Sequence, residues 1–309
     1  MPRASWIALL ASFGVAAGAP AATPAPLPVS EVAAGEFVHT GRSLALDAPG
    51  HDDIANVGFI VGTRCVAVID SGGSPRIGRA LRAALRSRTQ LPVCYVINTH
   101  VHVDHVLGDV AFRDDHPHFV GHVGLAAALI RSRDFFLQNY RADFDSPPDA
   151  AQIMMPDRTV APGHDLHLDL GQRELLLQAW PRAHTDCDLT VFDAATATLW
   201  TGDLLFVGRT PALDGSLKGW LAVDVQLAQR AVKHVVPGHG PVGSDLAAAL
   251  APQQRYLQAL LEGVRGAIAA GKPLQEASRA VQPAHIGWQL WDATHPRNVA
   301  RAYQELEWE

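Results

Sequence analysis

Cysteine and lysine are both rare in this chain of 309 residues, with three of each. Three cysteines cannot build a dense disulfide framework, and no C-x-x-C pair is present for a structural zinc site. Lysine and arginine form no run and the net charge is −6, so nothing attracts the chain to nucleic acid. Histidine stands out against this scarcity, because 15 histidines make imidazole the first chemistry to look for.

Long apolar runs are also missing, apart from one near the amino terminus. Met1 and Arg3 precede an apolar stretch at residues 6–17, which is too short to span a bilayer stably. Small residues follow, and Ala19-Pro20-Ala21 fits a cleavage site. We therefore predict a secretory signal peptide at residues 1–22 and an extended, proline-rich linker at 23–30. The expected product is exported to the periplasm and has no membrane span in its mature chain.

The rest of the chain alternates between apolar runs typical of strands and helical spacing, which favours an α/β fold. With 48% apolar and 18% charged residues it can bury a large core. Two runs joined by Gly62-Thr63-Arg64 predict a hairpin, and Ser74 with Pro75 predicts a helix start. Strands are expected at 36–40, 57–61, 65–69, 93–97, 118–121, 166–170, 173–179, 189–193, 198–201 and 233–236. Helices are expected at 75–88, 107–113, 123–140, 220–232, 245–270, 273–281 and 297–306, and residues 143–165 are expected to form a loop.

One short segment concentrates metal-binding side chains. His100, His102, Asp104 and His105 lie within six residues, directly after a predicted buried strand. Zinc prefers histidine nitrogen and aspartate oxygen. Alternation along an extended turn brings His100, His102 and Asp104 out on a similar side, whereas the adjacent Asp104 and His105 diverge. One loop can therefore supply two metal ions.

Three later residues complete a candidate ligand set. His184 and Asp203 each follow a predicted strand, and His239 lies where a strand runs into a Gly/Pro turn. Each alone could have a structural role as a cap or a loop residue. Taken together with the first segment, all of them follow strands, at the edge where α/β proteins place their sites.

The ordered set HxHxDH, His, Asp, His resembles the metallo-β-lactamase-fold hydrolases. The resemblance implies a four-layer αβ/βα sandwich with a dinuclear metal site at the sheet edge. Residues 31–309 would then form a single hydrolase domain, with a C-terminal helical extension from about residue 245.

The resemblance also assigns the ligands. His100, His102 and His184 would hold the first metal, Asp104, His105 and His239 the second, and Asp203 would bridge both. Asp70, in Val-Ile-Asp-Ser-Gly, matches a position that supports the His-rich loop, although a plain turn residue is the alternative. A bridging aspartate in place of the cysteine or serine of true β-lactamases is similar to the glyoxalase II and lactonase branches.

Three further stretches, 53–60, 213–220 and 305–309, look like the exported quinoprotein relay system zinc metallohydrolases. That family is named for its genomic association with PQQ-dependent dehydrogenases. The resemblance therefore implies a pathway, with a periplasmic quinoprotein dehydrogenase or cytochrome c as a possible partner, and it does not imply a substrate.

The expected activity is hydrolysis of a small ester, thioester or lactone. Two Zn²⁺ ions would lower the pKa of a shared water so that hydroxide attacks the carbonyl at neutral pH. Asp104 is the expected catalytic residue, as a carboxylate that takes over a proton during the cycle. Lys218 or Arg209 could bind an anionic group of the substrate, and simple surface solvation is the alternative for both.

Three other functions stay open at this point. A persulfide dioxygenase would use one Fe²⁺ on the equivalents of His100, His184 and Asp203. A β-lactamase is disfavoured by Asp203. A non-catalytic partner in a redox relay would not need the complete ligand set.

Two smaller expectations concern residues outside the ligand set. Cys65 and Cys94 lie in predicted strands and are interpreted as small buried apolar residues. Trp220 is expected in the core or in the pocket wall.

Overall fold

The computed structural model describes residues 24–284 and 287–309. The predicted signal peptide and the first linker residue lie outside the described residues. Residues 24–29 run as irregular chain into the first strand, and Leu27 N donates to Ala80 O at 3.0 Å. Within the described ranges, no helix has the length and apolar character to cross a membrane.

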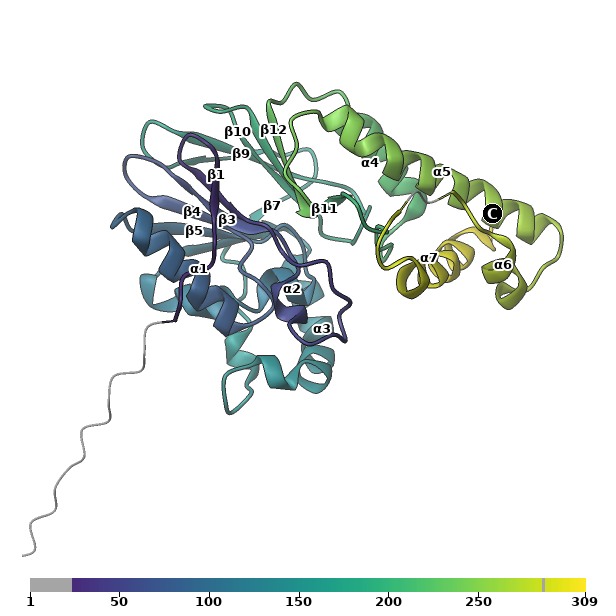
Figure 1. Cartoon of the computed structure of the whole chain (residues 1–309), viewed down its shortest axis with the longest axis horizontal. Coiled ribbons are helices and arrows are strands. Elements are labelled where there is room, and N and C mark those ends of the chain that lie inside the picture. The colour runs from purple at the N-terminus through teal and green to yellow at the C-terminus, as the bar shows by residue number, and fades with distance from the viewer. Residues whose placement is uncertain (1–23, 285–286) are drawn as a thin grey trace, which may run out of the picture.

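The first sheet has seven strands, arranged in chain order from β1 to β7 (Figure 1). Its early strands pair antiparallel as successive hairpins, and β4 to β7 pair parallel. The parallel strands bring their carboxyl ends to one edge. The strands are β1 (Ser30–Ala33), β2 (Glu36–His39), β3 (Val57–Val61), β4 (Val66–Ile69), β5 (Val93–Ile97), β6 (His118–His122) and β7 (Arg158–Val160).

The second sheet has five strands in the order β12-β11-β10-β9-β8. Only β11 and β12 pair parallel, while the other neighbours are antiparallel. As a result β9, β11 and β12 all point the same way. The strands are β8 (Leu166–Asp169), β9 (Glu174–Ala179), β10 (Leu189–Asp193), β11 (Thr198–Phe206) and β12 (His234–His239).

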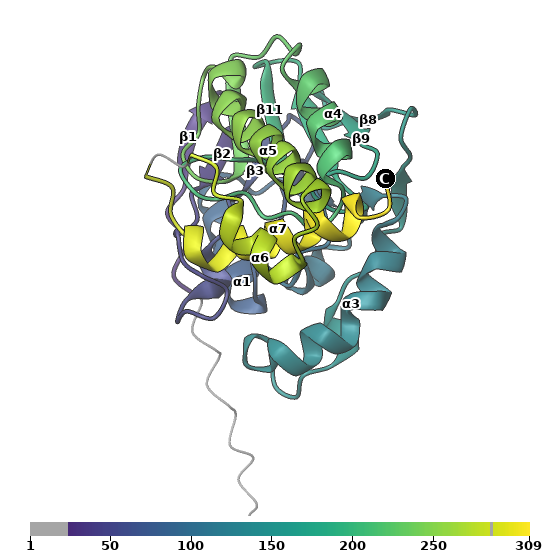
Figure 2. The same cartoon turned by 90° about the vertical axis from the view of Figure 1, so that its right-hand side faces the viewer.

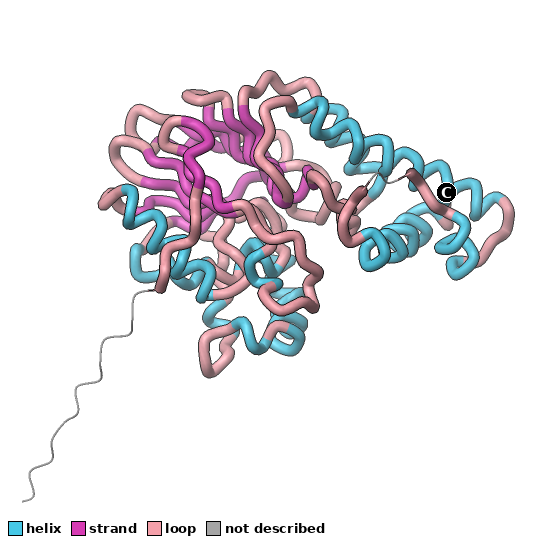
Figure 3. Tube along the Cα trace, viewed as in Figure 1, coloured by secondary structure: helices cyan, strands magenta, loops and turns pink. Residues whose placement is uncertain are grey.

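The two sheets pack face to face, with helices on both outer faces (Figure 3). Side chains such as Ile60, Ile97, Leu177 and Trp200 fill the space between the sheets. The other face of the first sheet packs against α1 (Pro75–Arg88) through residues such as Leu81. This is the predicted four-layer αβ/βα sandwich, because apolar side chains on both faces of each sheet need cover.

The remaining helices divide between two halves of the molecule, the first with the seven-stranded sheet and the second with the five-stranded sheet. The first half also carries α2 (Val103–Val106) and α3 (Leu125–Asn139), together with short 3-10 turns at His51–Asp53, Asp109–Asp115, Arg141–Asp143 and Ala150–Gln152. The second sheet is covered by α4 (Leu217–Leu227) and α5 (Leu246–Ala269), and α6 (Leu274–Ala280) and α7 (Trp291–Leu306) extend from them (Figure 2).

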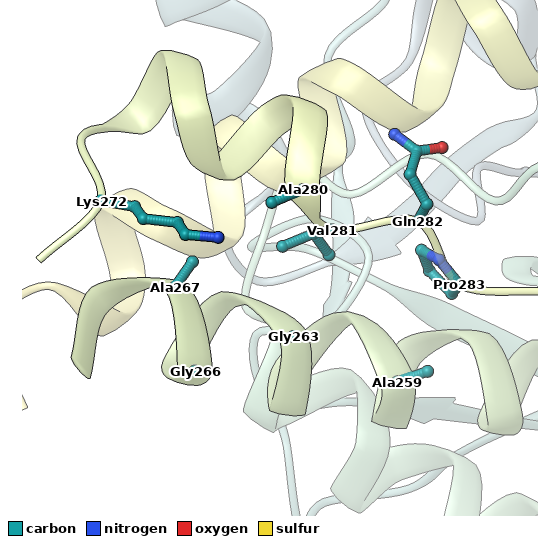
Figure 4. A pocket seen from close by; sticks show the side chains of 9 residues that line it. All are labelled: Ala259, Gly263, Gly266, Ala267, Lys272, Ala280, Val281, Gln282 and Pro283. Atoms are coloured by element: carbon teal, nitrogen blue, oxygen red, sulfur yellow. The ribbon is translucent and has the colours of Figure 1, made fainter. Parts of the chain in front are cut away.

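A pocket opens between α5 and α6 (Figure 4). Small residues line it, and Gly263 leaves room for Val281, whose Cγ1 would lie 2.8 Å from a Cβ at position 263. Lys272 is the only residue with a charged side chain among those that line the pocket. None of the seven predicted metal ligands lines it.

The structure corrects several expected elements. Residues 143–165 contain the edge strand β7 rather than only loop, and the expected helix 107–113 begins earlier as α2 and continues as a 3-10 turn. β11 runs five residues further than expected, to Phe206 instead of 201, so Asp203 lies inside a strand and not after it. β1 was not predicted.

Cys65 and Cys94 form a disulfide with Cα atoms 5.7 Å apart. The interpretation of these two residues as small buried apolar side chains is confirmed for Cys65 and did not include the bond between them. The cause of the bond is the parallel pairing of β4 and β5, which brings together residues that are 29 positions apart in sequence. Cys187 remains free and buried.

Candidate metal centre

The first part of the site lies where β5 ends. The chain turns after Ile97, passes through His100 and His102, and enters α2, which carries Asp104 and His105. The side chains of His100, Asp104 and His105 are almost completely buried, whereas His102 is partly exposed. A buried strand followed by a single helical turn thus presents four metal-binding side chains at one edge.

The second part comes from the other sheet. His184 follows β9, Asp203 lies within β11, and His239 is the last residue of β12. The Asp203 carboxylate lies against Gly238, where a Cβ would be 1.8 Å from Oδ1. Glycine at position 238 therefore lets Asp203 reach the site.

The structure brings all seven predicted residues together in two adjoining groups. One ligand atom from each member of a group lies within 4.8 Å of the others, and the groups are His100, His102, His184, Asp203 and Asp104, His105, His239. Asp203 also reaches the second group, because its Oδ1 is 3.2 Å from His105 Nε2 and its Oδ2 is 3.3 Å from His239 Nε2. This arrangement fits a dinuclear metal site, and Asp203 contacts both groups.

Asp70 fixes two of the imidazoles. Its carboxylate accepts from Thr99 N, Thr99 Oγ1 and His105 Nδ1, each at 2.8 Å. The Thr99 hydroxyl in turn lies 3.0 Å from His100 Nδ1. Asp70 is therefore a supporting residue of the loop and not only a turn residue, and its positive φ of 51° is held by these contacts.

The other three imidazoles also have fixed acceptors. His184 Nδ1 lies 2.7 Å from Ala212 O, and His239 Nδ1 lies 2.8 Å from Ile54 O. His102 Nε2 lies 2.8 Å from Asp214 Oδ2. When one nitrogen of a neutral ring donates to an acceptor, the other carries a lone pair, so all five rings in their neutral form would direct a lone pair into the cluster.

Several atoms that face the cluster lack partners. Among the described residues, His100 Nε2, His105 Nε2 and Asp203 Oδ1 are buried without a hydrogen bond. His184 Nε2 faces His102 Nδ1 at 3.1 Å, and both atoms would present lone pairs if the proton of each ring is on the nitrogen that contacts Ala212 O or Asp214 Oδ2. Unpaired buried polar atoms are costly in a protein interior, and cations that accept these lone pairs would satisfy them.

Electrostatics favour the metal-binding form of part of this donor set. Burial lowers the pKa of His184 to about 4 and, with the neighbouring His105, holds the pKa of His100 well below its usual range. Burial alone would raise the pKa of Asp203, but the imidazoles of His239 and His105 outweigh it and lower that pKa strongly. Burial acts against protonation of His105 and His102, but the carboxylates of Asp203, Asp70 and Asp104 raise the pKa of His105 well above its usual range, and Asp214 raises the pKa of His102. Because neutral imidazoles and ionised carboxylates are the forms that bind metal, metal binding would displace protons from these two rings.

Aromatic side chains enclose the second-sheet ligands. The Phe206 ring stacks on His239 with centroids 5.1 Å apart, and the Trp220 ring packs edge-on to His184 at 5.2 Å. Trp220 is fully buried and donates Nε1 to Leu204 O at 3.1 Å. It therefore belongs to the core and also supports His184.

The two candidate anion-binding residues lie in different places. Arg209 Nη1 is 3.2 Å from His239 Nδ1, and Arg209 Nε is buried without a partner among the described residues. Lys218 points away and pairs with Glu309 on the surface. Of the two, only Arg209 lies at the site.

Sequence reasoning missed the contributions of Ala212 and Asp214. Ala212 acts through its backbone carbonyl, which no side-chain pattern reveals. The only local signal for Asp214 is that Asp214-Gly215 suggests a turn, and a turn does not indicate contact with His102.

Comparison with known proteins places the chain in a family. The family model described as the metallo-beta-lactamase superfamily matches residues 50–239, which is more than half of the chain. The chain belongs to the metallo-β-lactamase superfamily. The match contains all seven cluster residues and ends at His239.

Solved structures of other proteins share this fold. A metallo-beta-lactamase from Pontibacter korlensis is 20% identical, with a TM-score of 0.61, and the match covers 75% of this chain and 99% of that one. The stereoselective inverting sec-alkylsulfatase Pisa1 from Pseudomonas sp. is 17% identical, with a TM-score of 0.64, over 90% of this chain and 50% of that one. At these identities the likeness shows the fold alone. No similar sequence is found among the curated proteins.

Proposed function

We propose that this metallo-β-lactamase superfamily protein is an exported dinuclear zinc hydrolase of a small ester, thioester or lactone. The observation that carries the proposal is the orientation of the five imidazoles. Each ring has one nitrogen on a fixed acceptor and the other in the cluster, around an aspartate that contacts both groups. A purely structural role would not need so many ring nitrogens that are held in orientation and face the cluster without a partner.

The chain's own residues divide the work. His100, His102 and His184 would hold one zinc ion, Asp104, His105 and His239 the other, and Asp203 would bridge them. Bound zinc would supply a water that is acidic enough to ionise near neutral pH and a Lewis acid for the carbonyl oxygen. Asp104 is the proposed proton acceptor, as a carboxylate that would take over a proton during the cycle.

Arg209 is the proposed binding residue for an anionic group of the substrate. Burial lowers the pKa of its guanidinium, and Asp104 and Asp203 act in the opposite direction. Its Nε has no partner among the described residues, so a carboxylate or phosphate on the substrate would satisfy a donor that is otherwise buried and unpaired.

Export to the periplasm rests on the sequence of residues 1–22. The Cys65–Cys94 disulfide supports it, because disulfides persist mainly in oxidising compartments. Association with a quinoprotein dehydrogenase or cytochrome c rests on the resemblance of the three short stretches to the quinoprotein relay hydrolases.

Metal analysis combined with a substrate panel tests this function. We expect about two zinc ions per chain and hydrolysis of thioesters, lactones or esters, with faster turnover of the anionic members. His102→Ala should remove most of the activity and weaken zinc binding, because an incomplete ligand set cannot hold an open site. The matched control is His167→Ala, on the surface of β8, which should change neither.

The same measurements separate the alternatives. One iron per chain with oxygen uptake on glutathione persulfide would support the dioxygenase, and turnover confined to β-lactams would support a β-lactamase. Less than about half a metal ion per chain, with no effect of His102→Ala, would contradict a metal-dependent hydrolase.

A further inference from the structure

One loop supplies acceptors to two imidazoles of the same group. In residues 210–216, Ala212 O lies 2.7 Å from His184 Nδ1, and Asp214 Oδ2 lies 2.8 Å from His102 Nε2. Both imidazoles belong to the group that contains His100 and Asp203. The other group has its acceptors elsewhere, on Asp70 for His105 and on Ile54 for His239.

Helix α7 holds this loop along one face. Asn298 Oδ1 accepts from Leu213 N at 2.9 Å, and Asn298 Nδ2 donates to Pro211 O at 2.6 Å. Arg301 donates to Asp214 O at 3.0 Å and to Gly215 O at 2.7 Å. Glu305 accepts from Ser216 Oγ and Leu217 N, each at 2.7 Å. The spacing 298, 301 and 305 places the three side chains on one helical stripe.

The opposite side of the loop rests on the His184 segment. Asp214 N and Gly215 N donate to His184 O, at 3.1 and 2.6 Å. The approach is so close that a Cβ at position 215 would lie 2.2 Å from Ala183 O. The loop is thus clamped between α7 and the backbone of a candidate ligand, which leaves little freedom to Ala212 and Asp214.

We propose that α7 positions the imidazoles of the first metal site, with Arg301 and Asp214 as positioning residues. The inference rests on the proposed metal-binding function. Residues 291–306 lie outside the part of the chain that matches the family, so the clamp is supplied by this chain's C-terminal extension. Because the acceptors fix ring tautomer and orientation, loosening them should weaken one site and spare the other.

Zinc affinity, measured by chelator competition on the full-length protein, tests the inference without relying on activity. Asp214→Ala and Arg301→Met should bind one zinc ion as tightly as the wild-type protein and the other roughly 10- to 100-fold more weakly. Asp214→Asn should lose less zinc affinity than Asp214→Ala, because the amide oxygen of asparagine can still accept a hydrogen bond from His102 Nε2. Arg265→Met is the matched control, since Arg265 pairs with Glu309 and not with the loop.

Thermal unfolding of the metal-free proteins separates positioning from general stability. The metal-free Asp214→Ala and Arg301→Met proteins should unfold at temperatures close to that of the metal-free wild-type protein. Unchanged affinity at both sites, or an equal loss at both sites with an early unfolding transition, would overturn the inference. A wild-type protein that binds two zinc ions tightly but hydrolyses nothing would overturn the proposed hydrolase and leave α7 as the positioning element.

Discussion

At the scale of single residues, two sets of buried polar side chains differ in what surrounds them. Those of the metal cluster have unpaired atoms that point at one another, as a ligand set requires. Asp224 on α4 is different, because it is fully buried and its best contact is Gln253 Nε2, 3.3 Å from each carboxylate oxygen. Gln253 also accepts from Phe206 N and donates to Leu204 O, so this pair joins α4 and α5 to the strand that carries Asp203.

Asp224 should make stability depend on pH. Burial raises its pKa to about 8, and the hydrogen bond from Gln253 acts in the opposite direction. The folded state therefore holds the proton more tightly than the unfolded state. The stabilisation is complete below the ordinary aspartate pKa and is lost as the pH rises towards 8, at no more than about 1.4 kcal/mol per pH unit.

Asp224→Asn should remove this loss of stability with rising pH, because an asparagine side chain does not titrate. We expect urea unfolding midpoints of the wild-type protein to fall more steeply between pH 5 and pH 8 than those of the variant. Asp134→Asn, at an exposed acid on α3, is the control and should keep the wild-type slope. Parallel slopes for Asp224→Asn and the wild-type protein would show that Asp224 does not hold the proton in the folded state.

At the scale of elements, the local sequence pattern was sufficient to predict a strand or helix whose own residues mark both of its ends. The bounds predicted for β3, α1 and β5 are confirmed, because each has a compact apolar run or a cap next to a clear breaker. The start of α7 was missed because Pro296 lies inside the helix, and proline normally marks a boundary. β7 was missed because three residues between Pro- and Asp-rich turns form a strand only by pairing with β6.

The same contrast applies to the candidate site. The seven cluster residues lie in recognisable segments near the ends of predicted strands, so sequence alone could bring them together. Asp214 could not be found in this way, since its contact with His102 depends on α7, and Arg301 is 87 residues further along the chain. Contacts fixed by distant elements leave no local signal.

The disulfide between the start of β4 and β5 should contribute measurably to stability. It closes a segment that contains the whole of α1. Closing a loop of this length lowers the entropy of the unfolded chain and adds about 2–4 kcal/mol to the free energy of unfolding. Reductant should therefore lower the urea midpoint of the wild-type protein. In the double variant Cys65→Ser/Cys94→Ser the midpoint should already be low and should not respond to reductant. A wild-type midpoint that ignores reductant would rule out this contribution.

At the scale of the whole molecule, the candidate ligands come from both halves. His100, His102, Asp104 and His105 belong to the half with the seven-stranded sheet, and the other three belong to the half with the five-stranded sheet. Bound metal would therefore connect the two halves at the edge where the sheets meet.

Removing metal should destabilise the whole chain. An ion that binds only the folded state adds about 4 kcal/mol to the free energy of unfolding when its free concentration is 1,000 times Kd. Chelation should therefore lower the Tm by roughly 5–15 °C. Differential scanning calorimetry with and without chelator measures this shift, and excess zinc should restore the original Tm. If the zinc content falls to zero while the Tm stays constant, the metals do not connect the halves.

The division of the ligands between the halves also decides when a metal ion can be acquired. Neither half alone presents a full set, so the site exists only after β5, β9, β11 and β12 have come together. A complete site of this kind would bind metal only once these distant segments have come together. The ions available in the compartment where folding finishes, rather than where the chain is synthesised, would then determine which metal the protein carries.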